Sequence, residues 1–232
     1  GVAQRLIAAY NRSGALDKMS WQRELAREMA NDEYAASAVH VSSGDADPQP
    51  EGRVIVNPIS GERVVIRVSG AQTGGELLIF DLYLPPGAHV PARHVHPVQE
   101  EQFTVLAGQM RFRVGRLGRR SILAHPGETV RVQAGTAHWF GNPGSQTSHA
   151  RVEVRPALRM EELFETTEAI GQADRGGGTR PPRLTDLAHV VLEFQREVAV
   201  PHVPAFLVNV LLAPLAWLGR RRVRAALSES VK

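Results

Sequence analysis

The 232-residue sequence predicts a mainly β protein, an antiparallel sandwich or barrel with helical segments before and after it. Between residues 53 and 154, short runs rich in β-branched residues recur about every ten residues and are separated by Gly and Pro. On either side of this region, apolar residues recur at three- and four-residue spacing, which is the period of an amphipathic helix.

The helical pattern before the β region covers residues 2–37, where Leu6, Tyr10, Leu25 and Met29 share helical spacing. Residues 42–52 are rich in Ser, Asp, Pro and Gly, which is typical of a linker. We therefore expect three parts: an N-terminal helical segment and linker at 1–51, a β-barrel at 52–156 and a C-terminal helical extension at 157–232.

Alternation of apolar and polar residues, bounded by turn residues, defines the expected strands. They lie at residues 53–57, 63–68, 76–84, 102–106, 110–114, 121–123, 129–132, 138–140 and 150–154. After Pro156 the spacing becomes helical again, and helices are expected at 158–170, 184–200 and 203–218.

Composition and charge exclude several classes of protein. The chain has no cysteine, which excludes disulfide scaffolds, thiol nucleophiles and cysteine metal sites. This composition fits a reducing compartment, and no signal peptide is visible, so we expect a cytoplasmic protein. The net charge is +3, but after residue 219 five basic residues face only Glu229, a local charge of +4. The remainder sums to −1, so we do not expect nucleic-acid binding.

Histidines gather where the strands are predicted, with five of the nine between residues 89 and 138. On a strand, His94 and His96 point to the same face because side chains alternate. Glu101 follows at the start of the next apolar run, and His138 begins a later strand. Three imidazoles and one carboxylate suit one divalent ion of intermediate softness, namely Fe, Mn, Ni, Cu or Zn. Four protein ligands leave coordination positions open, as a catalytic site requires.

Two glycine-framed motifs carry a family resemblance. The segment from Gly87 to Gly108, which contains His94, His96 and Glu101, resembles the first motif of the cupin superfamily. The segment 127–142, which contains His138, resembles the second, and the phrase HVHPVQEEQFTVLAGQMRFRVG is similar to bacterial single-barrel cupins. The resemblance implies a jelly-roll-like barrel over about residues 53–155, with one metal ion held by the three histidines and Glu101. It also implies a homodimer.

The metal would lie in an apolar cup. If Glu101 points inward, Phe103 and Val105 do so as well, and Phe140 follows His138 in the same way. With Phe112 from the neighbouring strand, these residues form the expected substrate pocket. The alternative is that the aromatic side chains are simply barrel core. Such a cup would suit a small, partly apolar molecule with an oxygen for the metal.

This pattern favours a metal-dependent enzyme, an oxygenase or an isomerase, with Glu101 as the candidate general base. The alternative is a non-catalytic cupin that binds a small ligand as a sensor or scaffold, because one fold serves many functions.

The apolar segment 198–218 has about the length of a membrane span, but Pro201, Pro204 and Pro214 interrupt it. We expect a helical tail that packs on the barrel or a partner subunit and buries Trp217 and Leu218. Attachment to a membrane surface through the Arg run is the less favoured alternative. The expected dimer interface combines Val54, Ile55, Val64, Val65 and parts of 205–218.

Overall fold

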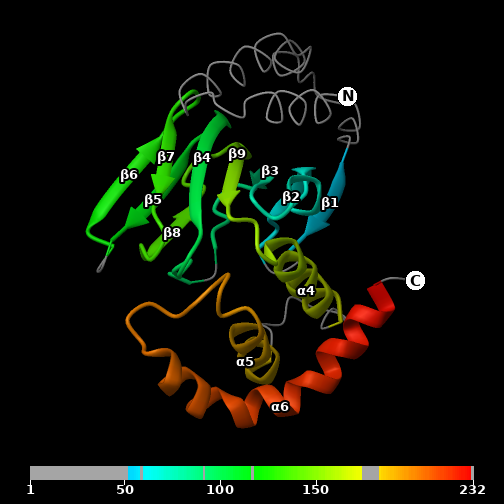
Figure 1. The fold of residues 1–232 in the computed structure, drawn as a ribbon. Coiled ribbons are helices and arrows are strands. Elements are labelled where there is room, and N and C mark those ends of the chain that lie inside the picture. The colour runs from blue at the N-terminus through cyan, green and yellow to red at the C-terminus, as the bar shows by residue number, and fades with distance from the viewer. Residues whose placement is uncertain (1–51, 58–59, 91, 116–117, 174–182, 231–232) are drawn as a thin grey trace. The chain divides into compact units, whose positions relative to one another are not determined.

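Two antiparallel sheets form the body of the molecule (Figure 1). The computed structural model describes residues 52–57, 60–90, 92–115, 118–173 and 183–230. Six strands form one sheet in the order β1-β2-β3-β9-β4-β7, and three form the other in the order β6-β5-β8. The strands are β1 (Arg53–Val56), β2 (Arg63–Val68), β3 (Leu78–Leu84), β4 (Glu100–Ala107), β5 (Met110–Val114), β6 (Arg120–Ala124), β7 (Thr129–Val132), β8 (His138–Gly141) and β9 (Ser148–Arg155). This topology is a jelly-roll-like arrangement, as the sequence predicts.

Each of the nine predicted strands is present, with boundaries that differ by a few residues. Three residues lie side by side on one face of the large sheet. Phe103 of β4 is the cross-strand partner of Val152 of β9, and Val152 is also the partner of Phe80 of β3. All three are buried, and the facing strand β5 adds Met110 and Phe112 to the same core. The core therefore lies between the two sheets, because alternate residues of each strand point inward.

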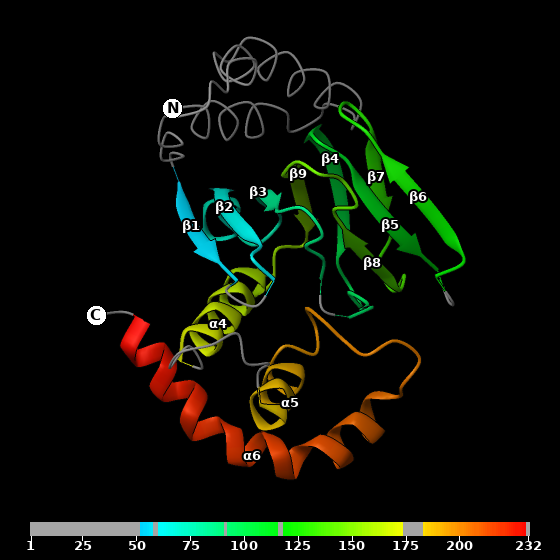
Figure 2. The ribbon, with the colours of Figure 1, turned by 180° about the vertical axis from the view of Figure 1, so that it is seen from behind.

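Three helices follow the last strand: α4 (Met160–Ala173), α5 (Leu184–Glu193) and α6 (Ala205–Ser230). In Figures 1 and 2, α4 lies beside β1 and β2, and α5 and α6 lie on the same side of the molecule as α4. The Phe164 ring of α4 meets the Phe80 ring edge-on, with centroids 5.2 Å apart, so this helix extends the barrel core.

The helix α6 packs closely on α5. A Cβ atom at Gly219 would collide with the backbone carbonyl of Thr185, so only glycine permits this approach. Nearby, the Nε atom of Arg222 lies 3.2 Å from a carboxylate oxygen of the buried Asp186. The helices predicted at 184–200 and 203–218 have different ends in the structure. The helix α5 ends at Glu193, and α6 continues through Pro214 and the Arg run to Ser230.

One expectation about the C-terminal segment is wrong: Trp217 and Leu218 do not pack against the barrel, since they are 70% and 60% exposed. Their packing on a partner subunit, and the homodimer itself, stay predictions. Of the residues assigned to a dimer interface, Ile55, Val64 and Val65 are already buried within the chain, whereas Val54 is 37% exposed. Among the described helices, none is both long enough and apolar enough to cross a membrane.

Contacts divide the chain into two units, residues 1–51 and 52–232. The helices and linker expected at 2–37 and 42–52 fall almost entirely in the first unit, outside the described residues.

Candidate metal centre

Three separate chain segments bring the predicted ligands together. Glu101 lies on β4 and His138 begins β8. The backbone of His94 forms a bridge with His138, in which each amide donates to the carbonyl of the other at 3.0 and 2.9 Å. The amide of Gly135 donates to the carbonyl of His96 at 2.8 Å. The two motifs therefore face each other as neighbouring strands, with their histidines directed inward.

The four side chains converge on one point. One potential ligand atom from each of His94, His96, Glu101 and His138 lies within 4.8 Å of the others. The Oε2 atom of Glu101 is 2.9 Å from Nε2 of His138 and 3.3 Å from Nε2 of His96. His138 is fully buried, Glu101 and His96 are 5% exposed, and His94 is half-buried. Access to the cluster is therefore best on the side of His94.

Backbone carbonyls orient all three imidazole rings. The Nδ1 atom of His94 lies 3.1 Å from the carbonyl of Ala92, and that of His138 lies 3.2 Å from the carbonyl of Thr136. Nδ1 of His96 contacts the carbonyl of Glu197. Since a carbonyl can only accept, each Nδ1 must carry the hydrogen, and in the neutral rings this leaves the Nε2 lone pairs directed at the centre.

The electrostatic surroundings favour the protonation states that metal ligands need, a neutral His94 and an ionised Glu101. Burial, together with the neighbouring histidines, lowers the pKa of His94 to about 3, so this ring is neutral near pH 7. Burial raises the pKa of Glu101, but His96 and His138 more than offset it and hold this pKa well below its usual range. Burial also lowers the pKa of His96, yet the Glu101 carboxylate raises it above its ordinary value. The centre therefore holds an ionised carboxylate among the three rings, which is one requirement of a cation site.

The donor set fits a divalent metal ion. Nε2 of His96, Nε2 of His138 and Oε2 of Glu101 are buried and have no hydrogen-bond partner of acceptable geometry among the described residues. Buried polar atoms are normally paired, and lone pairs that face one another at such distances require a cation between them. A proton can serve only one pair of these atoms, whereas a metal ion can bind all of them. Three nitrogen donors and one carboxylate are the ligands that ions of intermediate softness prefer.

Neighbouring polar residues lie outside this cluster. Glu100 points away and accepts a hydrogen bond from Gln133 at 2.7 Å. Gln102 also points away, because Arg131 donates to its carbonyl oxygen at 2.6 Å. His125 lies in an exposed turn.

The four residues assigned to a substrate pocket pack against one another. The Phe103 ring lies 5.1 Å from that of Phe112 and 5.0 Å from that of Phe140, between centroids. All three rings and Val105 are buried. The Phe140 ring is also 6.4 Å from the His94 ring, so the apolar cluster borders the candidate metal ligands. A role in substrate binding stays a prediction, because these contacts equally suit barrel core.

Sequence patterns did not indicate Glu197, which lies about a hundred positions after His96. Residues 194–199, here called the C-terminal strap, pass along the side of the extended segment His94–His96 that is opposite His138. The amide of Val95 donates to the carbonyl of Ala199 at 3.1 Å, and the amide of Ala199 donates back at 2.9 Å. No local motif could reveal this pairing, since it depends on how α4 and α5 return the chain to the barrel.

A second acid with a shifted pKa was also missed. The pKa of Glu62 is raised to about 7, chiefly by burial; a hydrogen bond from Ser60 lowers it in part, and the charge of Glu101 adds a smaller increase. Its position between Gly61 and β2 carries no motif that marks it in the sequence.

Comparison with known protein families gave one match: the cupin domain family model matches residues 80–153. These residues include all four side chains of the cluster. No curated protein gave a significant match to the chain.

Solved structures with a similar fold cover about half of the chain or less. A sugar phosphate isomerase of the cupin superfamily from Silicibacter pomeroyi is 19% identical, with 45% of this chain and 71% of the other aligned at a TM-score of 0.39. A predicted oxalate decarboxylase from Thermotoga maritima is 20% identical, with 45% and 90% aligned at a TM-score of 0.39.

Proposed function

Because this chain contains a cupin domain, we propose that it is a metal-dependent enzyme, an oxygenase or an isomerase, acting on a small molecule that binds the ion through oxygen. One observation supports this most directly. Three imidazoles are oriented by backbone carbonyls so that their Nε2 atoms converge with a buried carboxylate.

The residues that would hold the ion are His94, His96, Glu101 and His138. Such an ion would supply Lewis-acid polarisation of a bound oxygen and, for Fe, Mn, Ni or Cu, redox chemistry with dioxygen. The four residues would leave one or two coordination positions for substrate or water.

The chain's own residues would orient the substrate and exclude water. His94 is the least buried of the four, so a small molecule would approach on its side. The Phe140 ring beside it presents an apolar surface, which favours a ligand with a hydrophobic body next to its oxygen atoms. Burial at the centre strengthens the interaction of Glu101 with any cationic or proton-bearing group, because little water competes.

Glu101 is the candidate general base. Its carboxylate is ionised at neutral pH, since its pKa is held well below the usual range. If it loosens from the ion, the carboxylate could accept a proton from a carbon next to the reacting oxygen.

A second candidate function is that of a non-catalytic sensor or scaffold. The close packing of Phe103, Phe112 and Phe140 favours it, because side chains that fill the core leave less room for a substrate. The two functions share the metal centre and differ in turnover.

The test begins with elemental analysis of the purified chain and titration with Fe, Mn, Ni, Cu and Zn salts. His96→Ala should lower metal content sharply, whereas His125→Ala, at an exposed turn, should not. The metal-replete protein is then assayed for oxygen uptake and product formation with catechols, diketones and flavonols. Equal metal content in the His96→Ala variant would exclude this centre. Ligand binding without turnover would favour the sensor or scaffold.

A further inference from the structure

The helix α6 presents an apolar face to solvent. Its opposite side, at Val208, Ala216 and Val223, is buried against the rest of the chain. Large apolar side chains on the outer side are exposed by 60 to 70%. They are Phe206, Val210, Leu211, Trp217 and Leu218. The spacings of four (Phe206 to Val210) and seven residues (Val210 to Trp217, Leu211 to Leu218) place them on one stripe of the helix.

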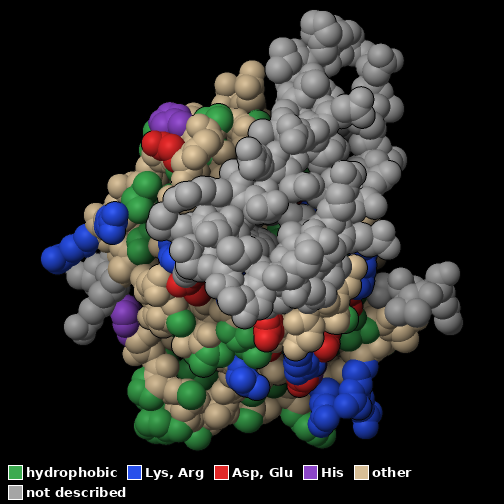
Figure 3. Space-filling view, turned by 45° about the horizontal axis from the view of Figure 1, so that its top comes forward, with side chains coloured by type: hydrophobic (Ala, Val, Ile, Leu, Met, Phe, Trp, Pro, Cys, Tyr) green, Lys and Arg blue, Asp and Glu red, His purple; other side chains and the backbone are tan. Residues whose placement is uncertain are grey.

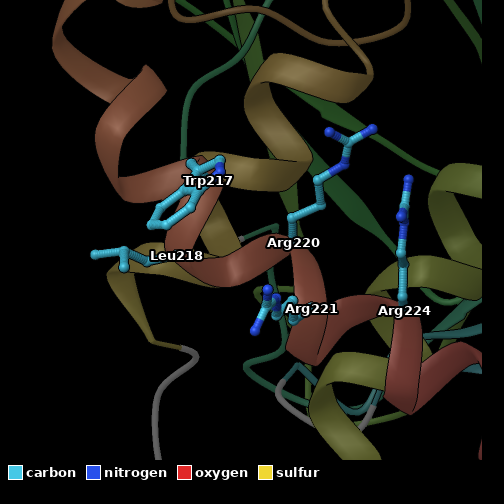
Figure 4. A pocket seen from close by; sticks show the side chains of 5 residues that line it. All are labelled: Trp217, Leu218, Arg220, Arg221 and Arg224. Atoms are coloured by element: carbon cyan, nitrogen blue, oxygen red, sulfur yellow. The ribbon is translucent and has the colours of Figure 1, made fainter.

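Basic side chains continue this stripe. Arg220, Arg221 and Arg224 are exposed, and Arg222 differs because it pairs with the buried Asp186. Figure 4 shows Arg220 and Arg221 about one turn beyond Trp217 and Leu218, and Arg224 about one turn farther along the helix; the five residues line a pocket of about 420 Å³. In the space-filling view, hydrophobic side chains gather along the lower edge and basic ones at the lower right (Figure 3).

From this arrangement we propose that α6 docks on an anionic lipid surface, with its apolar stripe in the headgroup boundary and its arginines on lipid phosphates. Interfacial helices combine an apolar stripe with basic residues, and Trp is favoured at that boundary. Among the described residues no helix can cross a membrane, so α6 would lie along the surface.

Charge argues against a second copy of the chain as the occupant. No Asp or Glu occurs between residues 205 and 228. In an antiparallel pair of these faces the arginines of one helix would meet only apolar side chains of the other, and in a parallel pair they would meet each other. Anionic headgroups supply the missing negative charge.

The test uses the full chain and two kinds of vesicle, phosphatidylcholine alone and phosphatidylcholine with phosphatidylglycerol. We expect the protein to sediment with the anionic vesicles and to be released by salt, because screening weakens the attraction. Arg221→Ala with Arg224→Ala should lower the partition coefficient about 30-fold, at about 1 kcal/mol per basic residue. The matched control is Arg111→Ala with Arg120→Ala, on exposed positions of β5 and β6.

The apolar half is tested by Leu211→Asp, with Leu123→Asp on the exposed face of β6 as its control. Only the first should reduce binding. Failure of the wild-type chain to sediment with anionic vesicles would overturn the proposal. So would equal binding to both vesicle types, or a dimer in solution that Leu211→Asp dissociates, since this would identify a second copy as the occupant.

A second, independent inference concerns the C-terminal strap and rests on the proposed metal centre. We infer that the strap positions the metal ligand His96. It lies outside the residues that match the cupin family model. The carbonyl of Glu197 accepts the Nδ1 hydrogen of His96, and the reciprocal bonds of Val95 and Ala199 hold the strap in register.

The strap is itself anchored. Glu197 is 3% exposed, and its carboxylate accepts a hydrogen bond from the amide of Arg159, just before α4, at 3.1 Å. Hydrogen bonds to the outer nitrogen of a ligating histidine set its tautomer and orientation, and their loss typically lowers metal affinity 10- to 100-fold.

The test compares Ala199→Pro, which removes the amide that donates to Val95, with Val200→Pro, whose amide makes no hydrogen bond within the described residues. Metal dissociation constants and the electron paramagnetic resonance spectrum of bound Mn²⁺ or Cu²⁺ are the readouts. Ala199→Pro should weaken binding at least tenfold and alter the spectrum, and Val200→Pro should do neither. Equal affinity and spectra in wild type and Ala199→Pro would overturn this inference. Absence of metal binding by wild type would instead overturn the proposed function.

Discussion

Replacing Glu101 by Gln should separate metal binding from folding. The Glu101 carboxylate oxygen lies 2.9 Å from Nε2 of His138 and 3.3 Å from Nε2 of His96, and these nitrogens carry no hydrogen in the neutral rings. An amide nitrogen at this position can donate to both of them. Because the substitution exchanges charge-assisted contacts with His96 and His138 for neutral hydrogen bonds to the same rings, the metal-free variant should lose no more than about 1 to 2 kcal/mol of stability.

The effect of metal should differ strongly between the two proteins. For wild type at a free metal concentration of a hundred dissociation constants, mass action stabilises the folded state by about 2.7 kcal/mol. For a domain of this size, this corresponds to a rise in Tm of about 5 to 10 °C. If the variant binds a hundredfold more weakly, the same metal concentration stabilises it by about 0.4 kcal/mol, a rise of about 1 to 2 °C.

The assay is thermal unfolding of both proteins, followed by circular dichroism with and without metal, alongside isothermal titration for affinity. His125→Ala serves as the control, since its side chain is exposed in a turn and its Tm should rise like that of wild type. The reasoning is refuted if Glu101→Gln gains as much stability from metal as wild type. It is also refuted if the metal-free variant loses several kcal/mol, because the carboxylate would then be required for folding itself.

Three further predictions concern stability and assembly. Burial raises the pKa of Asp81, but hydrogen bonds and the charge of Arg151 lower it far more. Its ionised form therefore stabilises the fold above about pH 4, and this contribution to stability is lost as the pH falls further. Asp81→Asn should therefore cost about 3 kcal/mol at pH 7 in urea unfolding, and a loss below 1 kcal/mol would contradict the role of this buried network. Gly108 has φ +69°, and a Cβ there would lie 2.9 Å from the backbone of β9, whereas Gly74 has φ +64° and open space around it. Gly108→Ala should therefore cost about 2 kcal/mol more stability than Gly74→Ala. Equal losses of stability would contradict the steric argument. We expect a homodimer that uses the edge strand β1, where Val54 is exposed. Light scattering should give the mass of two chains for wild type and the mass of one chain for Val54→Asp. A single-chain mass for wild type at micromolar concentration would exclude this dimer.

Local patterns predicted the strands well because a strand half-buried in a sheet must alternate apolar and polar residues. Arg63–Val68 and Thr129–Val132 were predicted with the boundaries that the structure has. Helix ends were less predictable. Spacing suggested an end of the last helix at Leu218, but contacts of Val223 and Ala226 with the core continue it to Ser230.

The metal ligands were identifiable in part for the same reason. His94 and His96 share a face whatever the fold, because side chains alternate on a strand. Only the order of strands in the two sheets brings His138 next to His94 and Glu101 next to both motifs. The family resemblance supplied this information, since spacing along the chain does not specify which strands become neighbours.

By itself, the sequence determined the strands, the inward face of each and the residue types of a metal centre, because these depend on local alternation and on donor chemistry. Only the tertiary structure decided which distant segments meet. The contact of Glu197 with His96 depends on the path of the chain through two helices. The exposure of Trp217 depends on which of two apolar sides of α6 packs against α5, and a helix that is apolar on both sides carries no local signal for that choice.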